Sequence, residues 1–287
     1  MLQQLRAAWH QGQLSDLALH FADLIARLDP VADEKVLLGA ALTSQYAVSG
    51  EVCVNLGEIA GTSVLVGVDG REIIAPKLSS WLTSLRRSSV VGTNDAYQPL
   101  VLENDNRLYL YQYRNLEARL ATALRSRAEA PDFDVDPARL NRALSIVFPV
   151  VAEAVEQREA AALAIRRPFA VISGGPGTGK TTTVVRVLAL LQELEIVVPD
   201  RVALSAPTGK AAARLREAMA QVSTESKLLD VSPLSDAVTL HRLLGCRSGG
   251  RPPTYGPNRA IPYDVVVVDE APATRLAYGG GLELSQR

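Results

Sequence analysis

Cysteine and histidine are scarce in this chain of 287 residues. Cys53 and Cys246 lie far apart and lack the spacing of a metal site, so neither a disulfide framework nor a thiolate metal centre is expected. Two such thiols are typical of a reducing compartment, and we therefore expect a cytoplasmic protein. His10, His20 and His241 are likewise too scattered to form a metal centre.

Long apolar runs and an excess of one charge sign are also missing. No run approaches the roughly 20 apolar residues that span a membrane, and residues 1–6 lack the charged-then-apolar pattern of a secretion signal, so we expect no membrane association. The net charge of −1 gives no overall signature of nucleic-acid binding, although a local basic face can coexist with an acidic remainder. The composition, 47% hydrophobic and 21% charged, is typical of a soluble globular protein.

Residues 1–128 are expected to form a mainly helical N-terminal domain. Apolar residues recur at helical spacing from Leu14 to Leu28, and Asp29-Pro30 ends that helix. Further helices are expected over residues 33–46, around residues 81–85 and over residues 115–127, and short strands over residues 52–56, 100–102 and 107–113.

In the last of these strands, aliphatic and aromatic residues alternate. Leu108 and Leu110 would point to one face of the strand. Tyr109, Tyr111 and Tyr113 would point to the other, and such a row can form a stacking surface for bases. The alternative, which we favour, is that these rings pack against the protein or lie at an interface.

The composition changes between residues 129 and 145. Residues 129–134 are an acidic, proline-containing stretch typical of a linker, and Asp136 and Pro137 are residue types that begin a helix. From there strands alternate with helices, as in a parallel α/β sheet. We expect a linker and helix over residues 129–145, followed by an α/β domain over residues 146–271.

A glycine-rich turn opens a helix in this second domain, after an expected buried strand over residues 169–172. The phosphate-binding motif G-x-x-x-x-G-K-[ST] is filled by Gly174, Gly179, Lys180 and Thr181. Its backbone N–H groups converge on a polyphosphate at the positive end of the helix. We expect the lysine to reach the β- and γ-phosphates of a nucleoside triphosphate and the threonine hydroxyl to bind Mg²⁺. The alternative is an ordinary turn with a solvated lysine.

An acidic pair follows a run of valines further along the chain. Residues 265–268 are expected to form a strand buried on both faces, with Asp269 and Glu270 at its carboxyl end, where α/β sheets bind ligands. We expect Asp269 to hold Mg²⁺ through water and Glu270 to deprotonate the water that attacks the γ-phosphate. The alternative is a loop that is polar only because it is exposed.

A third strand and turn lie between these two. Residues 202–206 are expected to form a strand, and Thr208, Gly209 and Lys210 follow it at the start of a helix. A helix N-terminus can bind an anion such as a DNA phosphate. A plain turn with a capping threonine is the alternative, and this segment by itself does not decide between them.

These segments together resemble the superfamily 1 helicases, specifically the RecD-like group, which includes the exodeoxyribonuclease V alpha subunit. The matching segments are residues 173–183, 206–212, 239–245 and 262–271. The resemblance is weaker over residues 107–111, which are similar to the N-terminal domain of the family. It implies a P-loop (RecA-like) parallel sheet with helices on both faces, preceded by the mainly helical domain.

The resemblance also implies the residues that bind ATP. Gln157 lies where the family keeps a glutamine whose amide reads adenine, and the alternative is a solvated glutamine on a helix. The other implied nucleotide-binding residues are Gly174, Gly175, Pro176, Gly177, Thr178, Gly179, Lys180, Thr181 and Thr182. Lys180 and Glu270 are the implied catalytic residues, and Thr181 and Asp269 the implied metal-binding residues.

DNA contacts are implied in the same way. By analogy Thr208, Gly209 and Lys210 contact the backbone of single-stranded DNA. Thr239 and His241 would line the DNA path, although a histidine at a capped helix start is an equal alternative for His241.

The implied activity is that of an ATP-dependent DNA helicase with Mg²⁺ and ATP as cofactors. Such a protein acts on single-stranded and double-stranded DNA during double-strand-break repair and recombination. In the alpha subunit the N-terminal domain docks onto a companion subunit, so the implied protein partners are the beta and gamma subunits of exodeoxyribonuclease V.

After Ala271 the chain departs from the family. The family continues with serine, methionine, an aliphatic residue and aspartate, and then a second motor domain, whereas residues 272–287 follow no sustained pattern. We expect this tail to be poorly ordered, as after a frameshift, a premature stop or in a fragment of a gene model. In the family the second domain supplies an arginine worth about 10³ to 10⁵ in rate. The chain alone, with an incomplete RecA-like domain over residues 146–271, should bind Mg·ATP with little hydrolysis.

Two other functions stay open. One is an interaction module, in which residues 1–128 dock onto exonuclease partners and the nucleotide site has no turnover. The other is a small-molecule kinase or an unrelated P-loop ATPase. The segments over residues 208–210 and 239–245 argue against a kinase, which needs no contacts with DNA phosphates.

Overall fold

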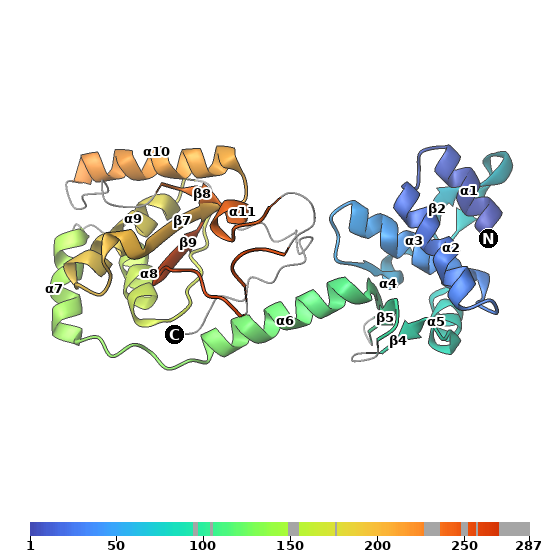
Figure 1. Cartoon of the computed structure of the whole chain (residues 1–287), viewed down its shortest axis with the longest axis horizontal. Coiled ribbons are helices and arrows are strands. Elements are labelled where there is room, and N and C mark those ends of the chain that lie inside the picture. The colour runs from blue at the N-terminus through green and yellow to red at the C-terminus, as the bar shows by residue number, and fades with distance from the viewer. Residues whose placement is uncertain are drawn as a thin grey trace. The chain divides into compact units, whose positions relative to one another are not determined.

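A computed structural model describes residues 1–93, 97–103, 106–148, 155–175, 177–226, 236–247, 252–256 and 258–269. The chain forms two compact units (Figure 1), one from the described residues of Met1–Arg119 and the other from the described residues from Leu120 onward. Within the described ranges, no helix is long and apolar enough to cross a membrane.

Three helices form the centre of the first unit. They are α1 (Leu2–His10), α2 (Asp16–Leu28) and α3 (Glu34–Val48). The Ser15 hydroxyl caps α2 by accepting from the Ala18 N–H, and the Asp33 carboxylate caps α3 by accepting from the Lys35 N–H. The helices predicted over residues 14–28 and 33–46 are confirmed.

Short strands complete the first unit. One sheet has the order β1-β6-β5-β4, in which β4 and β5 are parallel and the other pairs antiparallel. Its strands are β1 (Cys53–Asn55), β4 (Val91–Gly92), β5 (Leu100–Leu102) and β6 (Arg107–Leu110). An antiparallel pair and three short helices lie outside it: β2 (Ser63–Val66), β3 (Glu72–Ile74), α4 (Leu56–Ile59), η1 (Val68–Gly70) and α5 (Leu78–Arg87).

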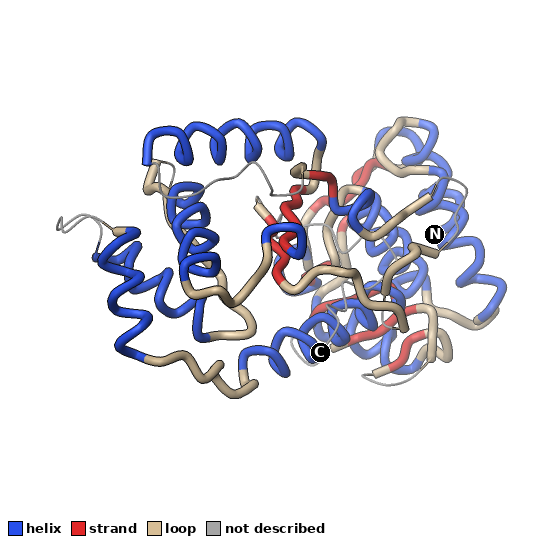
Figure 2. Tube along the Cα trace, turned by 60° about the vertical axis from the view of Figure 1, so that its left-hand side comes forward, coloured by secondary structure: helices blue, strands red, loops and turns tan. Residues whose placement is uncertain are grey.

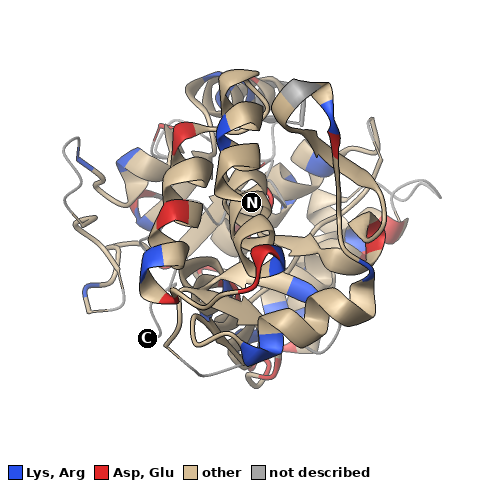
Figure 3. Ribbon diagram, turned by 90° about the vertical axis from the view of Figure 1, so that its right-hand side faces the viewer, with Lys and Arg blue, Asp and Glu red and all other residues tan. Residues whose placement is uncertain are grey.

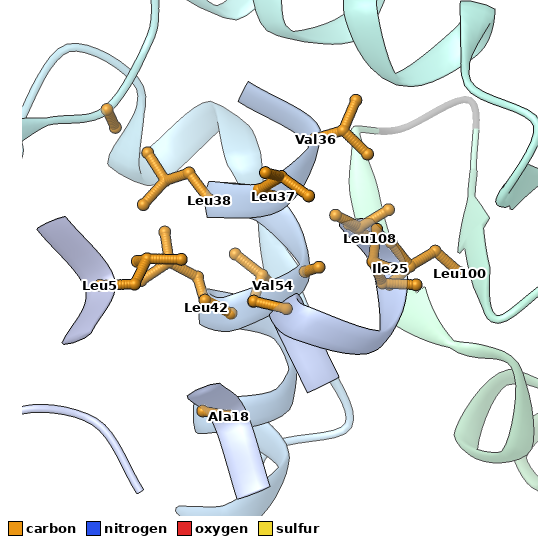
Figure 4. Close-up of a cluster of buried hydrophobic side chains, with 14 of the residues drawn as sticks. Leu5, Ala18, Ile25, Val36, Leu37, Leu38, Leu42, Val54, Leu100 and Leu108 are labelled. Carbon is orange, nitrogen blue, oxygen red and sulfur yellow. The ribbon is translucent and has the colours of Figure 1, made fainter. Parts of the chain in front are cut away.

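Buried aliphatic side chains join these helices to the four-stranded sheet. Figure 4 shows the cluster with side chains from α1, α2, α3 and the sheet, including Leu5, Ile25, Leu38, Leu42, Val54, Leu100 and Leu108. Trp81 of α5 is fully buried in the same cluster, and its indole N–H donates to the Lys35 carbonyl at 2.9 Å. A Cβ at Gly39 would lie 3.4 Å from that indole nitrogen, so the interior glycine lets α3 and α5 approach closely.

The cap of α3 gives the unit a pH-dependent contact. Asp33 accepts hydrogen bonds from the Lys35 N–H at 3.0 Å and the Ser84 hydroxyl at 2.8 Å. These bonds, the backbone one first, hold the pKa of Asp33 below its ordinary value. Because the folded-state pKa is lowered, the ionised carboxylate stabilises the fold above its unfolded pKa, and this contribution is lost as the pH falls through the folded value.

We expect Asp33→Ala to lower the free energy of unfolding at pH 7 by about 1 kcal/mol, the usual value of a helix cap. At a pH below the lowered pKa of Asp33 the loss should be smaller, because the native cap is then largely protonated. Urea denaturation at both pH values measures the two losses, with Glu51→Ala, an exposed acidic residue of the same unit, as the control. Equal losses at both pH values would contradict the expectation.

The strand predicted over residues 107–113 is wrong in its second half. β6 ends at Leu110, and Tyr111 begins the helix α6 (Tyr111–Ala128). The residues after Tyr113 are mostly good helix formers, and their helix extends back over both tyrosines. The three rings therefore share no strand face. Tyr109 is buried, which confirms packing for that ring.

The second unit contains the remaining helices and a parallel sheet. Its elements after α6 are α7 (Pro137–Val147), α8 (Val155–Arg166), α9 (Lys180–Glu193), η3 (Pro199–Arg201), β7 (Val202–Ala206), α10 (Gly209–Ser226), β8 (Val238–Thr239), α11 (Leu240–Leu243) and β9 (Val265–Val268). Asp136 caps α7 by accepting from the Ala138 N–H, with Pro137 in the first turn, as predicted.

The parallel sheet brings three loops to one edge. Its order is β8-β7-β9, with Ser205 paired to Val238 on one side and to Val268 on the other (red in Figure 2). Leu188 and Leu190 of α9 pack with Val202 and Leu204 of β7 in the core of this unit. The mixed α/β architecture with a parallel sheet and a largely helical first unit confirms the predicted fold class.

Two strand predictions in this unit need correction. Residues 169–172 form no strand, and Val171 is 75% exposed. β9 is half-buried along its length rather than buried on both faces. The physical reason is that a strand becomes buried only when neighbours pair with it. Within the described ranges β9 pairs with β7 alone, and residues 169–172 pair with no strand.

Candidate nucleotide-binding site

The glycine-rich loop runs directly into the N-terminus of α9. Gly179 is the N-cap residue, with φ at +79°, and Gly177 has φ at +78°. Residues with a Cβ rarely adopt this left-handed conformation, so the turn requires glycine at both positions. Gly179 has no side chain to cap the helix, and the first N–H groups of α9 point toward the loop as donors for an anion.

The Lys180 ammonium lies over the loop. Its Nζ donates to the carbonyls of Gly174 and Gly175, both at 2.8 Å. The Thr178 hydroxyl donates to the same Gly175 carbonyl at 2.9 Å, and a Cβ at Gly174 would lie 2.5 Å from its Oγ1. The loop therefore curls around the Lys180 ammonium, and at Gly174 it leaves no room for a Cβ. A glycine-rich loop of this kind can bind a polyphosphate.

Gln157, on α8, also reaches this loop. Its Nε2 donates to the Thr178 carbonyl at 3.2 Å. A Cβ added at Gly179 would lie 2.7 Å from that Nε2, so the amide packs directly against the N-cap of α9. The structure therefore places Gln157 of α8 beside Thr178 and Gly179 of the loop.

Arg186 is a residue of this site that the sequence analysis missed. Its Nη1 donates to Gln157 Oε1 at 3.0 Å, and its guanidinium lies 4.9 Å from the centre of the Phe148 ring. Burial lowers the pKa of Arg186, and its Nε is buried without a hydrogen-bond partner among the described residues. The available signal was a lone arginine in the otherwise apolar middle of α9.

The acidic end of β9 lies at the carboxyl edge of the parallel sheet. The Asp269 N–H donates to the Ser205 carbonyl at 2.9 Å, so the ladder with β7 continues one residue beyond β9. Glu270 lies outside the described residues, as do Pro176 and the tail over residues 272–287. Because residues 169–172 are not part of the sheet, strand pairing does not link Asp269 to the glycine-rich loop within the described ranges.

The remaining site residues lie at the same edge, after the end of β7 and at or after the end of β8. The Thr208 hydroxyl accepts from the Ala211 N–H at 3.2 Å and so caps α10, while Gly209 and Lys210 are exposed in its first turn. Thr239 caps α11 in the same way by accepting from the Arg242 N–H, and His241 is exposed on that short helix. Both threonines are therefore capping residues, and their contacts with DNA stay a prediction.

Basic and acidic residues are interspersed over the molecule. Figure 3 shows Lys and Arg mixed with Asp and Glu over the coloured part of the chain in that view. Several are paired, such as Arg201 with Asp264 at 2.7 Å and Arg167 with Asp132 at 2.9 Å.

Comparison with known proteins gives two family matches. Residues 10–109 match the model of the RecBCD enzyme subunit RecD, N-terminal domain. Residues 157–278 match the model of an AAA domain, so this match includes the glycine-rich loop and Asp269 and extends beyond Ala271.

Relatives match across both segments. The RecBCD enzyme subunit RecD of Mycobacterium tuberculosis is 38% identical over 275 residues, which cover 92% of this chain and 44% of the relative. RecD of Haemophilus influenzae is 37% identical over 177 residues, covering 57% of this chain and 27% of the relative. The ATP-dependent RecD2 DNA helicase of Deinococcus radiodurans is 30% identical over 180 residues, covering 58% and 20%.

The chain thus spans less than half the length of these relatives. The N-terminal match covers much of the first unit and the AAA match the glycine-rich loop, α9, β7 and β9. The predicted resemblance to the RecD-like group is confirmed, because a RecD relative matches 92% of this chain and a RecD domain model matches residues 10–109.

Proposed function

We propose that this chain is the ATP-binding N-terminal part of a RecD-like, ATP-dependent DNA helicase that acts in double-strand-break repair and recombination. The observation that carries the proposal is the glycine loop around the Lys180 ammonium, with its Nζ 2.8 Å from two loop carbonyls at the start of α9. The proposed organisation is an N-terminal domain (1–128), a linker and helix (129–145), a RecA-like domain (146–271) and a tail (272–287), in the cytoplasm.

The proposed nucleotide contacts follow from the groups that the loop presents. Bound Mg·ATP supplies the phosphoryl bond whose hydrolysis drives a helicase. The backbone N–H groups of residues 174–182, except that Pro176 has none, would donate to phosphate oxygens. The Lys180 ammonium would leave the loop carbonyls and bind the phosphates as well. The Thr181 hydroxyl and the Asp269 carboxylate would bind Mg²⁺, and Glu270 would take the proton of the attacking water.

Gln157 would recognise the adenine base through the amide donor and acceptor that form no hydrogen bond within the protein. An amide has two N–H donors and an oxygen with two lone pairs. Thr178 uses one donor and Arg186 one lone pair, so one donor and one acceptor stay available. Those are the groups that match the N7 acceptor and the N6 donor of adenine. Arg186 would act as a positioning residue, because it holds the amide oxygen in one orientation.

We expect Arg186→Met to reduce the preference for ATP over GTP by about three- to tenfold, the effect of one hydrogen bond. The aliphatic stem and the packing on Phe148 are largely kept, while the donor to Gln157 is lost. Competition of ATP and GTP against a fluorescent ATP analogue measures the ratio. Arg158→Met is the matched control, since Arg158 is a neighbour of Gln157 that contacts Ser145 instead. An unchanged ratio in Arg186→Met would contradict this role.

DNA binding is proposed at the carboxyl edge of the sheet. Thr208, Gly209 and Lys210 begin α10 after β7, so the N–H groups of this helix start could bind a phosphate of single-stranded DNA. Thr239 ends the neighbouring strand β8 and His241 follows it, and both would line the same path. Double-stranded DNA would be the substrate that the complete helicase unwinds.

The experiment that tests the helicase proposal is ATP hydrolysis with and without single-stranded DNA, using this chain joined to the remaining part of a RecD relative. We expect DNA to stimulate hydrolysis in the joined protein, and the chain alone to bind Mg·ATP with little turnover, because a second domain supplies the arginine in this family. If DNA leaves hydrolysis by an active joined protein unchanged, the helicase proposal fails.

The proposed protein partners are the other exodeoxyribonuclease V subunits, beta and gamma. The match of residues 10–109 to a domain of a RecBCD subunit supports this assignment. The same match favours the second candidate function, in which the chain serves as an interaction module of that complex without turnover. Binding of these subunits by a variant that cannot bind ATP would separate the two functions.

A further inference from the structure

Arg186 of α9 contacts both of the helices that precede α9 in the second unit. Its guanidinium donates to the Gln157 amide oxygen of α8 at 3.0 Å and lies 4.9 Å from the centre of the Phe148 ring. Phe148 is the C-cap residue of α7, where its N–H donates to the Leu144 carbonyl at 2.9 Å. The helices α7, α8 and α9 pack against one another (Figure 1). The arginine side chain therefore connects the end of α7 with the helix that carries Gln157.

The Phe148 ring is an important part of the surroundings of this guanidinium. Phe148 is only 1% exposed, so the ring is shielded from water. Among the described residues, no carboxylate pairs with Arg186, and its Nε is buried without an acceptor. A cation that is partly removed from water and has no carboxylate partner can be stabilised by the face of an aromatic ring. The ring therefore helps to fix the position of the guanidinium.

Two contacts decide which way the Gln157 amide faces. The guanidinium has only donors, so the atom beside it must be the amide oxygen. The Thr178 carbonyl only accepts, so the atom 3.2 Å from its oxygen must be the amide nitrogen. Turning the amide over would place donor against donor and oxygen against oxygen. The observed orientation of the amide therefore depends on Arg186.

This orientation suits adenine better than guanine. Adenine presents an acceptor at N7 and a donor at N6, whereas guanine presents acceptors at N7 and O6. The donor and the acceptor that Gln157 has available match adenine, but its oxygen would face the O6 oxygen of guanine. An amide that is free to turn loses this distinction. Holding the amide oxygen in place therefore favours ATP over GTP.

We propose that Phe148 is a positioning residue for base recognition, which holds the Arg186 guanidinium against the Gln157 amide so that the site selects adenine over guanine nucleotides. The inference rests on the proposed function, from which it takes the nucleotide site, and it extends that site to the end of α7. Phe148 also belongs to the core of the second unit, together with Leu144 and Val147. The test must therefore separate base recognition from packing.

The test is the ratio of the ATP and GTP affinities of the full chain, measured by competition against a fluorescent ATP analogue. We expect Phe148→Leu to reduce the preference for ATP by about two- to fivefold, the effect of a modest cation–π contact. In an Arg186→Met background the same replacement should cause no further loss, because the guanidinium that the ring positions is absent. The affinity for Mg·tripolyphosphate, which has no base, should be the same in all variants. An unchanged ratio in Phe148→Leu, or an equal loss in both backgrounds, would overturn the inference.

Leu144→Ala is the matched control for packing. Leu144 is buried one turn before Phe148 in the same core. Its replacement should lower the free energy of unfolding and leave the ratio of affinities unchanged. A loss of preference in Leu144→Ala equal to that in Phe148→Leu would assign the effect to loosening of α7 and overturn the inference.

Two further measurements separate this inference from folding and from the proposed function. Circular dichroism shows whether each variant is folded, and Phe148→Met, which also lacks the ring, replaces Phe148→Leu if that variant does not fold. If wild type binds neither nucleotide, the proposed function fails. If wild type prefers ATP and the folded variant without the ring keeps that preference, this inference alone is wrong.

Discussion

Replacement of Lys180 by alanine should weaken the binding of Mg·ATP by at least tenfold and up to about a hundredfold, the value of one or more charge-assisted hydrogen bonds. The ammonium is the single charge around which the loop is built, with Nζ 2.8 Å from the carbonyls of Gly174 and Gly175. Without it those carbonyls would face the phosphates with nothing to offset the repulsion. Isothermal titration of the chain with Mg·ATP measures the change.

The control for this variant is Arg139→Ala. Arg139 is a cation of the same unit whose exposed pair with Glu195, at 3.3 Å, contributes little to stability. We expect this control to bind Mg·ATP as wild type does. If Lys180→Ala and wild type share one affinity, the loop is not used to bind nucleotide.

Replacement of Glu270 by glutamine should leave Mg·ATP binding nearly unchanged and reduce hydrolysis in the joined protein by about 10²- to 10⁴-fold, the usual contribution of a general base. Glutamine keeps the size of the side chain but cannot take a proton from water. Asp269, the preceding residue in the chain, lies at the carboxyl edge of the sheet, where its N–H donates to the Ser205 carbonyl.

Single-turnover hydrolysis and equilibrium binding, measured on the same protein, separate the two effects of Glu270→Gln. Glu195→Gln makes the same change on an exposed carboxylate, the one paired with Arg139, and should alter neither quantity. Loss of binding together with hydrolysis would assign Glu270 to the binding of Mg·ATP rather than to proton transfer.

The sequence predicts the local parts of the site well. Gly177 and Gly179 adopt the left-handed conformation that the motif requires, and Lys180 begins the helix that was expected after the turn. These features depend on residues close together in the chain, where the absence of a Cβ and the start of a helix decide the geometry. The predicted cap at Asp136 is local in the same sense.

The sequence predicts the structure less well where the conformation of a segment depends on residues far away in the chain. Residues 169–172 have the composition of a buried strand, but a strand forms only beside a neighbour, and none of the described residues provides one. Tyr111 and Tyr113 alternate as strand residues do, yet the helix formers that follow draw them into α6. Arg186 was missed because its contact with Gln157 joins α8 to α9, and no local pattern encodes that pairing.

The most direct test of the account is amide hydrogen exchange of the chain with and without Mg·ATP, read by mass spectrometry of its peptides. We predict slower exchange over residues 173–182, in the loop and first turn of α9, while α2 and α5 of the first unit stay unchanged. Unaltered exchange over residues 173–182 at a nucleotide concentration that saturates binding would show that ATP is held elsewhere.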